Sequence, residues 1–358
     1  MAGDREDDLR TLQHCLATVD VLARELGRLR EQLVALQRQA AGRTPGGSPT
    51  PVPGAPVPPG VPASAGLAPY EVPGYEPVPP RPGFLKKTPA TLEQWVAVFD
   101  IDQLPVLGST AREIERWRAD EDTVDLHALG EVIRGDPLMS LKLFARVSRA
   151  RGLHPGSDPE NVTGALVMLG VSRFFQVFGP QRSVEQLLAD WPQALEGFER
   201  VLRRCERAAR FALGFAVQRM DHDAALIYSA ALLHDFAELL VWFTAPHLAL
   251  EMRRRQQARP GLRSADVQQM LLNLRLVELQ RALSHHWHLP ARLLAITDVH
   301  RNPNSLQVRT VQLAVRIARH TAAGWDDPAI PDDLTEIARL LNLAPEPTLK
   351  LLRGIDEG

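Results

Sequence analysis

The chain has 358 residues, of which 45% are hydrophobic and 23% are charged, and its formal net charge is −2. These proportions are typical of a globular protein with a sizeable core. The near balance of charge excludes the strongly basic surface that drives non-specific binding to nucleic acid. The low net charge and the ample hydrophobic content also exclude a chain that is intrinsically disordered over its whole length.

The cysteine count, the N-terminal residues and the most apolar stretch indicate the compartment and whether the chain crosses a membrane. Two cysteines, Cys15 and Cys205, are too few for a disulfide framework or a thiolate zinc site. The first residues are acidic, whereas a signal peptide begins with basic residues. The most apolar stretch, residues 230–250, is interrupted by ionisable residues from His234 to His247, which make a membrane span costly. We therefore expect a cytoplasmic protein that does not cross a membrane.

Residues 1–40 are predicted to form one amphipathic helix that begins near residue 6. Its apolar positions follow a heptad seam with one three-residue slip between Val19 and Leu22. They are Leu9, Leu12, Leu16, Val19, Leu22, Leu26, Leu29, Leu33, Leu36 and Ala40. This seam predicts a coiled coil between copies of the chain, and the alternative is a helix that packs on the chain's own globular domain.

Residues 41–83 are predicted to be a disordered linker. They contain 14 of the 29 prolines and eight of the 24 glycines. Proline removes backbone donors, and glycine raises the entropic cost of ordering the chain. We expect an extended tether, with a proline-motif docking site as the alternative.

Residues 84–358 are predicted to be an all-α domain, because helical spacing recurs and period-two alternation does not. Asp136 before Pro137, and Asn161, are predicted N-caps, and Gly170 ends the helix that Asn161 begins. Asp333 with Glu336 resembles a capping box. We expect roughly ten to thirteen helices.

The strongest local signal is the pair His234-Asp235 inside the apolar stretch LLHDFAELL. A buried histidine beside a buried aspartate is costly unless both find partners or bind an ion. Adjacent side chains of a helix point about 100° apart, so we expect the two not to face one another, although both could reach a common ion at a helix interface.

Five segments, in order, resemble an HDOD domain, a regulatory relative of the HD metal-dependent phosphohydrolases, over residues 104–302. They are LPVLGSTAREIERW, VIRGDPLMSLKLFARVSRA, VTGALVMLG, AALLHDFAELLVWF and SHHWHLPARLLAITDVHRNP. The resemblance implies a helical bundle, followed here by C-terminal helices in residues 303–358. Departures from the family pattern include Ser148-Arg149 in place of Asn-Ser, Ala237 in place of glycine, and a single histidine, His300, where two are common.

The HD superfamily's metal site, as the resemblance implies it, needs a histidine about thirty residues before the pair and a later aspartate. The first position falls near Cys205 among arginines, and the later helix TVQLAVRIARH has no acidic residue. Two protein ligands do not hold a catalytic metal. We therefore interpret His234 and Asp235 as a vestigial pair and expect Cys205 and His300 to lie in a polar pocket near it.

Two further patterns, a histidine cluster and the arginine-rich helix faces, could bind ligands but are interpreted as structural. His285 and His288 have metal-compatible spacing, but helix-end histidines are favoured by the dipole in any case. The arginines of residues 200–219, and Arg253, Arg254 and Arg255, could bind phosphates, but the near-zero net charge and the glutamates between them favour solvated helix faces.

The resemblance implies a role in bacterial signal transduction, and the missing metal ligands predict a non-catalytic protein that needs no metal or cofactor. It would bind a protein partner through the HDOD-like domain, and residues 6–40 would form a homo-oligomer and so raise the effective concentration. One alternative is a metal-dependent phosphodiesterase or phosphohydrolase that uses His222, His234, Asp235 and His300. The other is a nucleic-acid-binding regulator, and a nucleotide is a further candidate ligand.

Overall fold

The computed structural model describes residues 78–121, 124–151, 159, 161–259, 261–298 and 302–357. These residues belong to one compact unit, Pro73–Gly358. The predicted coiled coil in residues 1–40, most of the predicted linker, and His300 lie outside the described residues.

The described residues form seventeen α-helices, more than the sequence predicts, because several short helices lie between the long ones. The N-terminal elements are α2 (Leu92–Val98), η1 (Ile101–Gln103), α3 (Gly108–Arg118), α4 (Leu126–Gly135), α5 (Pro137–Arg151), α6 (Val162–Leu169), α7 (Val171–Val177) and α8 (Val184–Leu187). Extended pairing in this part of the chain is confined to one isolated bridge, Val106 with Ser183. The all-α prediction is confirmed.

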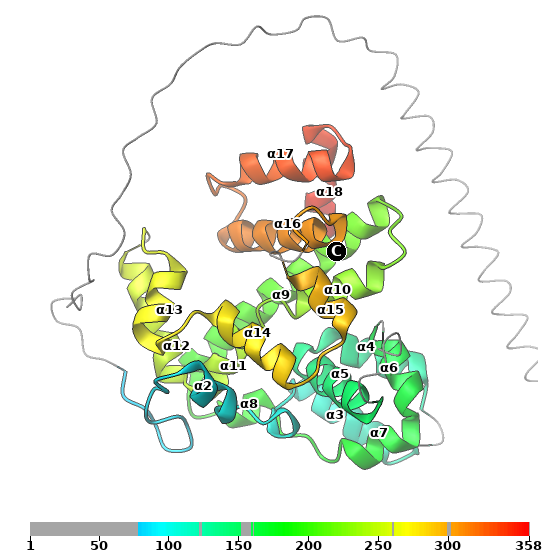
Figure 1. Ribbon diagram of the computed structural model, residues 1–358, viewed down its shortest axis with the longest axis vertical. Coiled ribbons are helices and arrows are strands. Elements are labelled where there is room, and N and C mark those ends of the chain that lie inside the picture. Colours follow the sequence, from blue (N-terminus) through cyan, green and yellow to red (C-terminus); the bar gives the residue numbers. More distant parts are fainter. Residues whose placement is uncertain are drawn as a thin grey trace, which may run out of the picture. The chain divides into compact units, whose positions relative to one another are not determined.

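The rest of the domain begins with a long helix. The elements are α9 (Pro192–Gln218), α10 (Ala224–Leu232), α11 (Phe236–Thr244), α12 (Pro246–Ala258), α13 (Ser264–Leu272), α14 (Leu276–His286), α15 (Ala291–Thr297), α16 (Leu306–His320), η3 (Thr321–Ala323), α17 (Ile330–Leu341) and α18 (Pro345–Glu357). Helix α9 packs against α10, α11, α12, α16 and α18, so it runs through the middle of the domain in Figure 1.

Small residues allow these helices to approach α9 closely. One face of α9 consists of small residues that are buried: Ala208, Ala209, Ala212 and Ala216. Because neighbours cover most of the circumference of α9, its polar side chains must also find partners inside the domain.

Two predicted N-caps are confirmed and help to fix the first half of the domain. Asp136 Oδ1 accepts hydrogen bonds from the backbone N–H groups of Leu138 (2.8 Å) and Met139 (3.0 Å) at the start of α5. Its other oxygen accepts one from Leu107 N–H, 2.8 Å away. Asn161 Oδ1 caps α6 through Gly164 N–H at 2.8 Å, and Gly170 ends that helix at φ 83°.

A buried lysine holds the segment before α3 against α5. Lys142 donates to the carbonyl of Leu104 at 2.9 Å and to Gln181 Oε1 at 2.6 Å. Burial lowers the pKa of its ammonium group to about 8, although the carboxylates of Asp102 and Asp136 act in the opposite direction. The opening segment of the family resemblance is therefore fixed by a polar contact inside the core.

The most apolar part of the chain is a pair of helices, α10 and α11, broken at residues 233–235. By length and composition alone, the stretch Ala224–Thr244 could cross a membrane, and most of it is buried in the core of the domain. Its apolar character therefore has an explanation in packing.

The C-terminal helices α16 and α17 are joined by a buried carboxylate. Asp333, which is 3% exposed, pairs with Arg316 at 2.6 Å and with His320 at 2.5 Å. The prediction that Asp333 begins this helix as a cap is wrong. Helix α17 starts at Ile330 with Pro331 in its first turn, and Asp333 instead points to α16.

Candidate functional site

His234 and Asp235 lie in the turn between α10 and α11. Leu233 and Asp235 have non-helical backbone angles, with ψ values of 3° and 25°. His234 Nδ1 lies 2.9 Å from Asp235 Oδ1, within hydrogen-bonding distance. The expectation that the two side chains point apart is wrong, because the helix that it assumed is interrupted at this pair.

Asp235 is held by two arginines from different helices. Arg204, on α9, donates to Asp235 Oδ2 through Nε (3.2 Å) and a terminal nitrogen (3.0 Å). Arg319, on α16, donates to Asp235 Oδ1 at 2.6 Å. The same terminal nitrogen of Arg204 reaches Glu238 Oε2 on α11 at 2.6 Å. Both oxygens of Asp235 are therefore engaged by cationic donors.

The arginines keep this buried carboxylate ionised. The Asp235 side chain is only 10% exposed, and burial alone would raise its pKa. Arg319, Arg204 and His234 more than offset that effect and hold the pKa of Asp235 well below its ordinary value. The charges of Arg204 and Arg319 balance those of Asp235 and Glu238, so the cluster is neutral without a metal ion.

The donor set does not fit the metal centre that the HD superfamily implies. Arg204 on α9 and Arg319 on α16 contact Asp235. A metal site would need carboxylate or imidazole ligands at these two positions instead of guanidinium groups. Within the described ranges, no three His, Cys, Asp or Glu side chains are grouped so that they could hold a metal ion. A divalent cation bound to Asp235 would also lie next to two guanidinium groups and be repelled by them.

The other predicted site residues do not join this cluster as ligands. Cys205 is buried, and burial, with the nearby carboxylate of Asp235, raises the pKa of its thiol above the ordinary value. A neutral, enclosed thiol is a poor nucleophile. His222 is exposed in the turn before α10, at the opposite end of that helix from His234. His300 lies outside the described residues.

The arginine face of α9 is solvated in part, since some of its arginines are exposed and others turn into the domain. Arg200 and Arg203 are exposed and pair with glutamates one turn away. The side chains of Arg204 and Arg207 are only 18% and 17% exposed. Arg207 connects α9 to the C-terminal helix α18 by donating two hydrogen bonds to Asp356, of 2.7 and 2.9 Å. The packing of α16 and α18 around α9 explains this difference.

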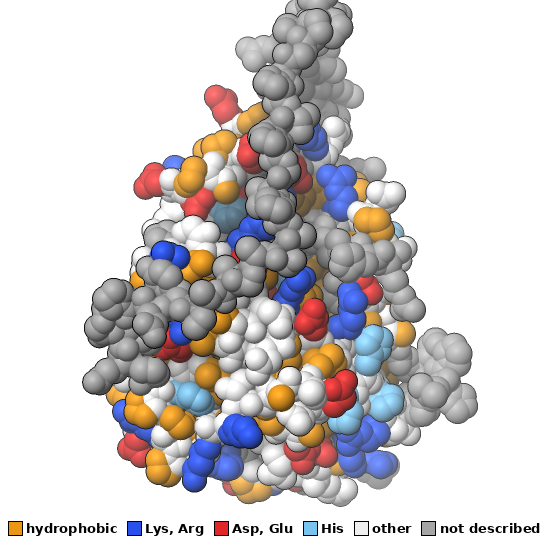
Figure 2. All heavy atoms as spheres, turned by 60° about the vertical axis from the view of Figure 1, so that its left-hand side comes forward, with side chains coloured by type: hydrophobic (Ala, Val, Ile, Leu, Met, Phe, Trp, Pro, Cys, Tyr) orange, Lys and Arg blue, Asp and Glu red, His pale blue; other side chains and the backbone are white. Residues whose placement is uncertain are grey.

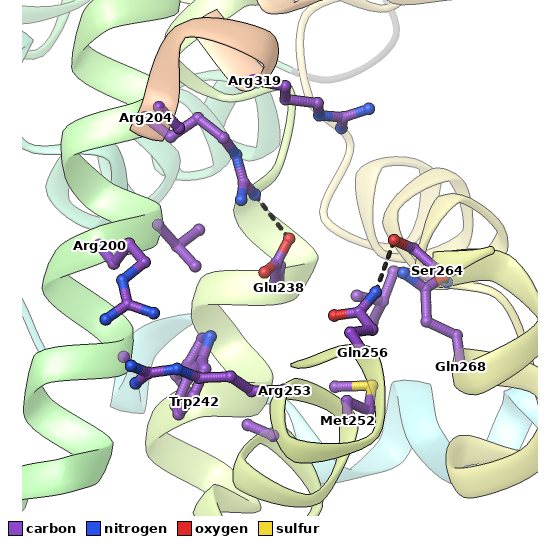
Figure 3. A pocket seen from close by; sticks show the side chains of 15 residues that line it. Arg200, Arg204, Glu238, Trp242, Met252, Arg253, Gln256, Ser264, Gln268 and Arg319 are labelled. Carbon is purple, nitrogen blue, oxygen red and sulfur yellow. Dashed lines mark hydrogen bonds and ion pairs between the residues drawn. The ribbon is translucent and has the colours of Figure 1, made fainter. Parts of the chain in front are cut away.

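A cavity of about 410 Å³ opens beside the cluster and is lined from α9, α11, α12, α13, α14 and α16. Figure 3 shows Arg204 and Glu238 on one side of it and Gln256, hydrogen bonded to Ser264 at 2.7 Å, on another. Cys205 is not among the residues that line this cavity. Sequence reasoning missed Trp242, Gln256 and Gln268, because they come from separate helices and carry no common motif.

The arrangement of helices around a His-Asp turn defines an all-α domain of the HD-like class. A family model for the HDOD domain matches residues 104–303, which is more than half of the chain, so the chain belongs to the HDOD domain family. The predicted match over residues 104–302 is thereby confirmed.

The solved structures that share this fold include two with TM-scores above 0.5. One is the MmoQ response regulator from Methylococcus capsulatus str. Bath, with a TM-score of 0.53, 20% identity, and coverage of 70% of this chain and 98% of that one. The other is a virulence factor from Campylobacter jejuni subsp. jejuni, with a TM-score of 0.53, 17% identity, and coverage of 75% and 99%. At these identities the likeness concerns the fold alone. No curated protein matches the chain.

Proposed function

We propose that this protein is a non-catalytic, cytoplasmic signal-transduction regulator that works by binding a partner protein through its HDOD domain. Residues 6–40 join copies of the chain through their heptad seam and so raise the valency of binding. The fold relative from Methylococcus capsulatus is a response regulator, which is consistent with this role.

The observation that carries the proposal is the engagement of Asp235 by Arg204 and Arg319. Metal-dependent phosphoester hydrolysis requires a metal-bound water and an open coordination position. Here Asp235 binds guanidinium groups, which do not activate water, and both of its carboxylate oxygens are occupied. The pair then serves to join α9, α11 and α16.

Charge distribution gives no comparable support for nucleic-acid binding. On the face shown in Figure 2, basic and acidic side chains are interspersed. Along α9 and α12, several arginines pair with glutamates on the same helix, as Arg200 does with Glu196 and Arg255 with Glu251. Such pairs reduce the positive field that a phosphate backbone requires.

A hydrolysis assay tests the non-catalytic proposal. With added Mn²⁺ and bis(p-nitrophenyl) phosphate as the probe, we expect the full chain to release p-nitrophenol no faster than its His234→Ala and Asp235→Asn variants. His286→Ala, which changes an exposed histidine on α14, is the matched control. Turnover that both site variants abolish and the control retains would contradict the proposal.

A further inference from the structure

One end of the cavity carries a positive charge that the described side chains neutralise only in part. Arg200 on α9 and Arg253 on α12 both donate to the same oxygen, Glu196 Oε1, at 2.7 and 3.3 Å. Two guanidinium groups thus share one carboxylate, whose side chain is 55% exposed. At the other end, Arg204 and Arg319 are balanced by Asp235 and Glu238. The excess positive charge therefore lies at the Arg200–Arg253 end.

Arg253 also has an unused donor. Its Nε is buried and has no hydrogen-bond partner among the described residues, and its side chain is only 23% exposed. A buried guanidinium nitrogen without an acceptor is costly, and a ligand's acceptor would remove that cost once the Arg253 side chain turns this nitrogen toward the cavity. Figure 3 shows Arg253 and Arg200 extending toward each other at this end of the cavity.

The remaining walls suit a flat polar ring. Trp242 and Met252 contribute apolar surface, and Gln256, Ser264 and Gln268 contribute amide and hydroxyl groups. A volume of about 410 Å³ lies in the range of small-molecule pockets, which runs from about 300 to 1,000 Å³. The wall thus combines polar and apolar side chains, and the polar ones can orient a bound ring.

We propose that this cavity binds an organic phosphate of mononucleotide size, with its phosphate on Arg200 and Arg253 and its ring against Trp242. A phosphate dianion matches both guanidinium groups with two-point hydrogen bonds, whereas the single carboxylate of Glu196 offers one oxygen to both. The ligand would displace Glu196, which is exposed and free to move aside. The assignment rests on the proposed regulatory function, because the bound ligand acts as a signal and is not consumed.

Calorimetric titration of the full chain, in buffer free of phosphate and sulfate, tests the assignment. The probes are AMP, GMP, adenosine and inorganic phosphate. We expect a mononucleotide to bind, adenosine not to bind, and inorganic phosphate to bind at least about tenfold more weakly than the mononucleotide. Arg200→Ala and Arg253→Ala should each weaken mononucleotide binding about tenfold or more.

Two matched control variants distinguish binding in the cavity from non-specific attraction of the phosphate to surface arginines. Arg203→Ala on α9 and Arg254→Ala on α12 remove neighbouring exposed arginines that do not line the cavity, and both should bind as the unmodified chain does. The assignment is overturned if no mononucleotide binds, if inorganic phosphate binds as tightly, or if all four variants bind equally. Binding that is followed by release of phosphate from the nucleotide would support the pocket and overturn the proposed regulatory function.

Discussion

Replacing Asp235 with alanine is expected to lower the free energy of unfolding by about 4 kcal/mol, because removing one member of a buried ion cluster leaves its partners' charges uncompensated. Arg204 is only 18% exposed and would retain Glu238 alone, and the bond from α16 through Arg319 would be lost. Urea denaturation followed by circular dichroism measures the change.

A second variant and a chelator show whether Asp235 stabilises the fold through its arginine partners or through a bound metal. His234 is more exposed, at 26%, so His234→Ala should cost about 1 kcal/mol. A chelator should leave the unfolding curves of all three chains unchanged. Equal losses from His234→Ala and Asp235→Ala, both reproduced by adding EDTA to the unmodified chain, would point to a metal site instead.

The pH dependence of this effect has a definite sign. Because the folded protein holds the pKa of Asp235 below its ordinary value, the carboxylate contributes stability that is fully present above the unfolded pKa of about 3.9. That contribution is lost as pH falls toward the folded pKa. The difference in stability between the unmodified chain and Asp235→Asn should therefore be constant near neutrality and shrink below about pH 4.

Replacing Gly197 with alanine is expected to destabilise the domain by about 3 kcal/mol, the upper end of the range for overpacking a core. A Cβ atom at Gly197 would lie 2.2 Å from two carbons of the Trp242 ring. That indole is only 5% exposed, so neighbouring side chains limit its movement. Relief would require α9 and α11 to separate, which would disturb the Arg204–Glu238 bond between them. Thermal unfolding measures the loss.

Gly354→Ala is the matched control for this substitution. Gly354 lies inside α18, and a Cβ atom there would meet nothing within 4 Å. Alanine in an open helical position should stabilise the protein by about 0.5–1 kcal/mol, because the unfolded chain loses freedom. If Gly197→Ala proved as harmless as Gly354→Ala, that result would contradict the close contact between Gly197 of α9 and Trp242.

Local signals and the order of family segments were sufficient to predict the fold class. Asp136 and Asn161 cap the helices they were expected to cap, because N-cap chemistry depends on residues only two or three positions away. The small residues of α9 lie on one buried face, because they recur at helical spacing within one stretch of sequence.

The candidate site was predictable only in part. The sequence singled out His234 and Asp235, but the partners of Asp235 come from positions 31 residues before and 84 residues after it. Neither arginine differs in local pattern from Arg200 or Arg203, which are exposed. Only the packing of α10, α11 and α16 around α9 decides which arginines turn inward, and the cavity depends on the same long-range packing.

The most direct test of the central claim, that arginines occupy the place of a metal, is elemental mass spectrometry of the full chain purified without a chelator or a polyhistidine tag. We expect manganese, iron and zinc each to be well below one ion per chain, in a protein that is folded by circular dichroism. One or two metal ions per chain, lost in both His234→Ala and Asp235→Asn, would contradict the claim and indicate a working HD-type metal centre.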